Sequence, residues 1–169
     1  MLWTALDLLA TRRPVAESRG RGLASALVAV VFVMVLSGAL VAGIRAGYAY
    51  NTWPLMNGRW MPAEILVISP WWNNFAYNMA TVQFDHRMIA YAIAVLAVLA
   101  WWRVRAAGAS PARPWGYAVL ATVVVQLSLG IATLLARVPV PLAALHQAGA
   151  VIVFACAIGL RHALRRAIT

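Results

Sequence analysis

The sequence contains no lysine and only four acidic residues, so charge is scarce along most of the chain. Charged residues make up 11% of it, whereas hydrophobic residues make up 64%. A soluble domain is usually about half apolar. A chain with so little charge needs lipid as its solvent, which excludes an ordinary soluble globular protein. The single cysteine, Cys156, also excludes an internal disulfide.

The basic residues are all arginines, and they give the chain a net charge of +10. On a soluble protein this charge would suggest nucleic-acid binding, but the arginines form short clusters between apolar runs and no continuous stripe. Such clusters are typical of topology determinants that face anionic lipid. We therefore expect a lipid bilayer as partner and no nucleic acid.

Four apolar segments are long enough to cross a hydrocarbon core of about 30 Å. They cover residues 23–44, about 79–102, 115–136 and about 138–160. Arginine clusters lie before the first segment, between the second and third, and after the fourth, so the positive-inside rule places both termini in the cytoplasm. The predicted fold class is an all-α membrane protein, a bundle of four transmembrane helices.

Residues 48–78, between the first two spans, are rich in proline and tryptophan. The tryptophans are Trp53, Trp60, Trp71 and Trp72. Because tryptophan favours the headgroup region, we expect a non-cytoplasmic cap that lies on the membrane interface and can hold a short helix. The bundle with its cap would occupy residues 22–169.

Residues 1–21 form a separate N-terminal segment. Its first nine residues are apolar but too short to span a membrane, and basic residues follow them, whereas a signal peptide has its basic residues first. We expect the tail of a helix whose beginning is missing, followed by a basic cytoplasmic loop. This pattern predicts a truncated chain.

His86 and His146 lie at similar depth, each about two turns into its span, on helices two and four, which run in the same direction. An ionisable side chain inside a membrane span is costly without a partner, so it is a functional candidate. Imidazole suits iron or copper, and two facing histidines can take both axial positions of one haem. We predict that this pair ligates a haem near the non-cytoplasmic face.

Other interpretations of the histidines remain open. His86 could belong to an interfacial polar group with Gln83, Asp85 and Arg87, and His146 could hydrogen-bond across helices through Gln147 or a backbone carbonyl. The third histidine, His162, lies among arginines at the cytoplasmic end, where we expect a solvated surface residue.

A haem also needs cations for its two propionates, which guanidinium groups bind well. Arg45, Arg87 and Arg137 lie on the expected non-cytoplasmic side, where they are either propionate partners or interfacial residues. Gln147, next to His146, completes the candidate cofactor-binding set. Leu36-Ser37-Gly38 and Leu127-Ser128-Leu129-Gly130 recur before the histidines as a faint parallel repeat.

Several ordered stretches of the chain resemble the haem A synthase family, in its proteobacterial and mitochondrial subclass. They are residues 43–56 (GIRAGYAYNTWPLM), residues 80–87 (ATVQFDHR), Gln126 with residues 129–134 (LGIATL), and residues 145–150 (LHQAGA). The resemblance covers nearly the whole chain, and the ordered set is specific where no single stretch would be.

The resemblance implies the C-terminal half of an eight-helix, pseudo-symmetric fold in the bacterial cytoplasmic (inner) membrane. By resemblance this half holds haem b, an iron porphyrin, through His86 and His146, and the full enzyme is an oxidoreductase. Its reaction oxidises the methyl group of haem O to a formyl group, which gives haem A for cytochrome c oxidase. Implied partners are the missing N-terminal half or a second copy, an electron donor, and haem O synthase.

Two other functional classes stay open at the level of sequence. One is a self-sufficient membrane cytochrome b that only transfers electrons. The other is a transporter or assembly scaffold without haem, which the matched intramembrane histidines disfavour.

Overall fold

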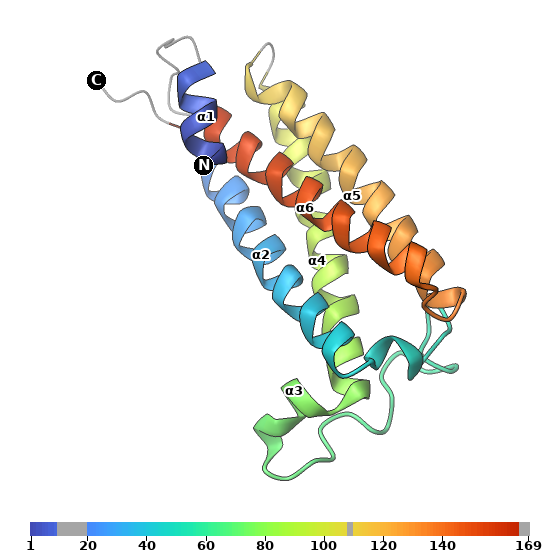
Figure 1. Cartoon of the computed structure of the whole chain (residues 1–169). Coiled ribbons are helices and arrows are strands. Elements are labelled where there is room, and N and C mark those ends of the chain that lie inside the picture. Colours follow the sequence, from blue (N-terminus) through green and yellow to red (C-terminus); the bar gives the residue numbers. More distant parts are fainter. Residues whose placement is uncertain (10–19, 108–109, 166–169) are drawn as a thin grey trace. The chain divides into compact units, whose positions relative to one another are not determined.

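The computed structural model describes residues 1–9, 20–107 and 110–165, and within them the regular secondary structure is helical. The elements in chain order are α1 (Leu2–Leu9), α2 (Arg21–Gly43), the 3-10 turns η1 (Ala46–Tyr48) and η2 (Trp71–Asn73), α3 (Asn74–Tyr77), α4 (Met79–Ala106), α5 (Ala112–Leu135) and α6 (Val140–Ala163) (Figure 1). An isolated bridge between Met56 and Arg59 adds a tight turn in the connection from α2 to α4.

Helices α2, α4, α5 and α6 are long and apolar enough to cross a membrane, which confirms the four predicted spans. The chain is thus an all-helical protein with four potential transmembrane helices. Only 17–28% of the residues in their apolar windows are buried inside the chain, as expected for helices whose solvent is lipid. Helix α4 continues past the predicted end and includes Arg103 and Arg105. Arginine is a good helix former, and its long stem lets the charge leave the apolar region.

The chain divides into two compact units, and each long helix contributes a part to both. Unit 1 contains Met1–Phe32, Ala92–Val124 and Val151–Thr169. Unit 2 contains Val33–Tyr91 and Val125–Ala150, and therefore holds the segment between α2 and α4 and both intramembrane histidines.

In unit 1, α1 packs against the end of α6. Nε2 of His162 lies 2.9 Å from Oδ1 of Asp7, and the His162 ring packs edge-on against Trp3 with the ring centroids 4.8 Å apart. Arg165 also pairs with Asp7. His162 is buried, so the expectation of a solvated residue was wrong. Asp7 lies 155 positions earlier in the sequence, which is why the local arginines gave no sign of this partner.

Glycines let α5 approach both α4 and α6 closely within unit 1. A Cβ on Gly159 would lie 2.3 Å from the Trp115 ring, and one on Gly116 would lie 2.3 Å from Val104.

Of the clustered arginines that predicted the orientation, four lie outside the described residues: Arg12, Arg13, Arg19 and Arg166.

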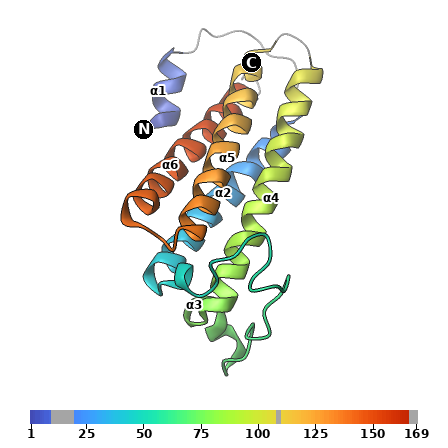
Figure 2. The same cartoon turned by 90° about the vertical axis from the view of Figure 1, so that its right-hand side faces the viewer.

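In unit 2, residues 48–78 lie between α2 and α4 and are called the cap below, and the predicted short helix is present there as η2 and α3 (Figure 2). Asn74 holds this segment together. Its side chain binds the backbone N–H and carbonyl of Ile68, the carbonyl of Trp71, and the side chain of Asn78. Oδ1 of Asn78 in turn accepts from the backbone N–H groups of Ala80 and Thr81 at the start of α4.

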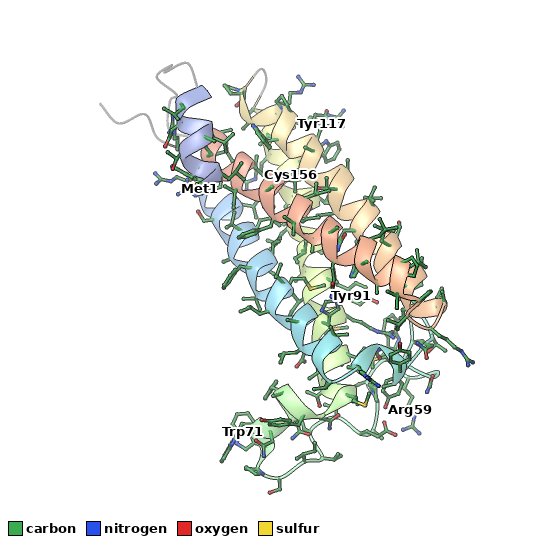
Figure 3. The ribbon with its side chains drawn as sticks, in the orientation of Figure 1. Met1, Arg59, Trp71, Tyr91, Tyr117 and Cys156 are labelled. Carbon is green, nitrogen blue, oxygen red and sulfur yellow. The ribbon has the colours of Figure 1, made fainter. Side chains whose placement is uncertain are left out.

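The outward side of this cap segment carries large exposed side chains. Trp71 packs edge-on against both Trp72 and Phe75, and all three remain exposed (Figure 3). The aromatic side chains thus form a cluster of their own, while buried asparagines fix the backbone beneath.

Candidate functional site

His86 lies about two turns into α4 and faces α2. Its Nδ1 lies 3.1 Å from Oγ of the buried Ser37. The next residue, Gly38, is also beside the ring, because a Cβ there would lie 3.6 Å from Cε1 of His86. The imidazole is therefore held toward α2 by one hydrogen bond and lies beside Gly38.

His146 lies about two turns into α6 and faces α5. A Cβ on Gly130 would lie 2.8 Å from Cε1 of its ring and 3.4 Å from Nε2, so this close approach needs glycine. The backbone carbonyl of His146 accepts a 2.7 Å hydrogen bond from Nε2 of Gln126. Gly149, one turn later on α6, makes room for that glutamine, since a Cβ there would lie 2.2 Å from its Oε1.

The two histidines share one arrangement. Each faces a glycine of the preceding long helix: His86 on α4 faces Gly38 of α2, and His146 on α6 faces Gly130 of α5. Both belong to unit 2. Figure 3 labels Tyr91 on α4, a little more than one turn beyond His86.

These imidazoles suit a metal that needs only two protein ligands. Nδ1 of His146 is buried without a hydrogen-bond partner. Among the described residues, no group of three or more histidine, cysteine, aspartate or glutamate side chains could enclose a bare metal ion. A haem iron takes four ligands from its porphyrin and two from the protein, so the donor set fits a haem with two axial histidines.

The side chain of Arg87 points toward the cap, whereas the neighbouring His86 faces α2. The buried Arg87 donates through its two terminal nitrogens to the backbone carbonyls of Tyr50, at 3.1 Å, and Pro54, at 3.4 Å. Gln83, one turn earlier on α4, also donates to the Tyr50 carbonyl, at 3.2 Å. The first turns of α4 therefore bind the cap backbone through two long polar side chains.

The other predicted cofactor contacts are exposed: Arg45, Arg137 and Gln147. Arg45 and Arg137 follow α2 and α5 and adopt left-handed backbone conformations, with φ of 57° and 61°. In the described structure the glutamine that binds His146 is Gln126, through the backbone.

Sequence reasoning gave no role to Ser37 or Gln126 as partners of the histidines. Ser37 belonged to the faint repeat, and Gln126 to a stretch that resembles the family. Those patterns singled out the positions. Which side chain contacts each histidine depends on how each helix is rotated about its axis, and a single sequence does not give that rotation.

The cap also holds an open groove of about 510 Å³, lined in part by Tyr50, Glu64, Tyr77 and Asn78. The Tyr50 hydroxyl donates a 2.8 Å hydrogen bond to Oε2 of Glu64. That bond lowers the pKa of the Glu64 carboxyl, while burial and the same carboxylate raise the pKa of Tyr50. Asn51 links the start of the cap to the end of α5, because its Nδ2 donates to the backbone carbonyls of Gly47 and Leu134.

A family model described as cytochrome oxidase assembly protein matches residues 1–158 of the chain. The chain belongs to this cytochrome oxidase assembly protein family. Within the family, it is 50% identical to the heme A synthase of Nitrosospira multiformis over 98% of its length. It is also 42% identical to the heme A synthase of Parvibaculum lavamentivorans, over 98% of its length, and 43% identical to that of Paracoccus denitrificans, over 94%.

The resemblance found in the sequence is therefore confirmed. The chain spans about half of these relatives, covering 48%, 47% and 41% of their lengths. Together with the four span-length helices, the relatives indicate a multi-pass membrane protein. No solved structure matches the chain.

Proposed function

We propose that unit 2 binds one haem b through His86 and His146. In this proposal the chain is the haem-binding half of haem A synthase, the oxidoreductase that converts the methyl group of haem O to the formyl group of haem A for cytochrome c oxidase. The observation that carries the proposal is the paired arrangement of two intramembrane histidines, each against a glycine, within one unit. The heme A synthase relatives support the reaction.

His86 and His146 would supply the two axial nitrogens of the haem iron. A haem b held by these two histidines would supply reversible one-electron chemistry rather than oxygen binding. The role of this half is then to pass electrons from a separate donor toward haem O, whose site lies in the other half of the full enzyme. Gly38 and Gly130 keep the rings against α2 and α5.

The haem propionates would take their cations from arginines of unit 2. Both terminal nitrogens of Arg87 donate to cap carbonyls, and its buried Nε has no hydrogen-bond partner. Arg45 and Arg137 are exposed and follow α2 and α5, so they can turn toward carboxylates at the same end of the helices. Gln147, one residue after His146, is proposed to contact the edge of the haem.

The proposed setting is the bacterial cytoplasmic membrane, with both termini in the cytoplasm and the cap on the opposite surface. The proposed partners are an N-terminal half or a second copy of the chain, an electron donor, and haem O synthase. The arginine clusters of the sequence support this orientation.

The first test is an optical spectrum of the detergent-purified chain, oxidised and then reduced with dithionite, with a pyridine haemochrome assay. We expect a low-spin b-type spectrum that His86→Ala and His146→Ala abolish or convert to high spin. His162→Ala is the matched control, because it removes a histidine that contacts Asp7 in unit 1. A folded, monodisperse chain without haem would contradict the proposal.

A stand-alone membrane cytochrome b is the second candidate, favoured by the presence of both histidines within unit 2. Extraction of haems from membranes that contain haem O, an electron donor and the chain, with and without a separately expressed N-terminal half of a relative, separates the two. Haem A formed only when the halves are combined supports the synthase. A reducible haem b without haem A under either condition supports the cytochrome.

A further inference from the structure

The two histidines of unit 2 are oriented by different means. Nδ1 of His86 has a hydrogen-bond partner, Oγ of Ser37, at 3.1 Å. Nδ1 of His146 is buried and has none. The repeat offers a serine before His146 as well, Ser128, but it is exposed and does not bond to that nitrogen. His146 is instead held by the close Gly130 contact and by Gln126 at its backbone.

We propose that Ser37 is a positioning residue that fixes the ring of His86 as a haem ligand and makes His86 and His146 inequivalent. The inference rests on the haem site proposed above. It assigns His86 as the more electron-donating ligand, and it assigns His146 as the ligand whose ring has no hydrogen bond at Nδ1 and packs against Gly130.

The argument begins with the tautomer of His86. An imidazole that ligates a metal through Nε2 must carry its proton on Nδ1. With the proton there, the contact to Ser37 has one direction, in which Nδ1–H donates and Oγ accepts. Such an outer hydrogen bond fixes the ring orientation and increases the basicity of the ligating nitrogen.

A more basic axial ligand stabilises ferric over ferrous haem, so it lowers the midpoint potential. Removal of Ser37 Oγ should therefore raise the potential of the bound haem. It should also change the electron paramagnetic resonance g-values, since these report the orientation and donor strength of the two imidazoles. The iron would still hold the ring of His86 after the hydroxyl is removed, so low-spin haem should be retained.

The test compares the complete, haem-loaded chain with Ser37→Ala, Ser37→Thr and Ser128→Ala. We expect Ser37→Ala to keep haem but to have a higher midpoint potential and shifted g-values. Ser37→Thr keeps a hydroxyl and should behave like the starting protein, and so should Ser128→Ala, the matched position in the repeat. If Ser37→Ala has the unchanged potential and g-values, or if Ser128→Ala shifts them equally, the inference is wrong.

A second measurement applies if Ser37→Ala does not retain haem. His86→Gly and His146→Gly are each supplied with imidazole or with 1-methylimidazole, and the affinity of each base is followed through recovery of the low-spin spectrum. Only imidazole has an N–H for Ser37, so His86→Gly should prefer imidazole, whereas His146→Gly should accept both bases alike. Equal preference at the two positions would overturn the inference while leaving the haem site intact. A wild-type chain without haem would overturn both.

Discussion

The guanidinium group of Arg87 donates a hydrogen bond to the backbone carbonyl of Tyr50 across 3.1 Å, and joins α4 to the cap. The two residues lie 37 positions apart, and the side chain of Arg87 is buried although it carries a charge. The adjacent residue, His86, faces α2 instead. One turn of α4 therefore serves both the cap and the candidate haem site.

Replacement of Arg87 by alanine should loosen the cap. The change removes the donors to the Tyr50 and Pro54 carbonyls, and hydrogen bonds to a charged group contribute about 1.5–3 kcal/mol each. Hydrogen exchange of residues 48–78 should accelerate in Arg87→Ala. Arg45→Ala, at an exposed position, is the control and should leave the exchange of the cap unchanged. Haem loss without faster exchange would show that Arg87 acts as a propionate partner rather than as a link to the cap.

Alanine at the two site glycines should have unequal effects. At Gly130 the added Cβ would lie 2.8 Å from the His146 ring and must displace it, whereas at Gly38 it would lie at an ordinary 3.6 Å from the His86 ring. We expect Gly130→Ala to cost about 1–3 kcal/mol in unfolding free energy and to reduce low-spin haem. Gly38→Ala should stay close to the wild type in both thermal unfolding and haem content. Similar behaviour of the two variants would contradict the described ring positions.

The buried amide of Asn74 should be one of the most sensitive positions in the cap. Its side chain makes four hydrogen bonds, and the loss of each typically costs about 0.5–1.5 kcal/mol. Asn74→Ala should therefore lower the thermal midpoint clearly and expose residues 64–78 to proteolysis. Asn73→Ala, whose side chain makes no capping hydrogen bond, is the neighbouring control. Equal protease resistance in the two variants would show that the network contributes little.

The Tyr50–Glu64 pair should make the cap sensitive to acid. The pKa of Glu64 is lowered mainly by its hydrogen bond from Tyr50, so the stabilisation is present above the ordinary glutamate pKa of about 4.3. It is lost as the pH falls through the lowered value. In Tyr50→Phe the pKa of Glu64 should rise toward its ordinary range. Carbon-13 NMR of the side-chain carboxyls of the two glutamates, Glu17 and Glu64, measures this shift. Tyr77→Phe, in the same groove, should leave it in place.

The sequence predicted the spans well because apolar length is a strong signal. The second span was expected at residues 79–102 and is found at Met79–Ala106, and the first was expected at 23–44 and is found at Arg21–Gly43. The differences lie at the helix ends, where arginine and glycine can continue a helix or end it. The cap helix also followed from composition, but its asparagine network did not, because no pattern distinguishes a buried Asn74 from a surface turn residue.

The candidate site was predicted in part. The matched depth of His86 and His146 selected two residues that the structure places in one unit. The contacts around them depend on rotation about the helix axes, and in the described structure Gln126 binds the backbone carbonyl of His146 and Arg87 binds the cap. The burial of His162 depends on Asp7, at the other end of the chain, which no local pattern could indicate.

The contact between Asp7 and His162 also constrains the order in which the protein can be completed during synthesis. Unit 2 ends at Ala150, so every residue of the candidate haem site has been translated before His162 exists. Asp7 of α1 is translated 155 residues before this partner. The histidine pair can therefore come together while Asp7 still lacks His162 as a partner.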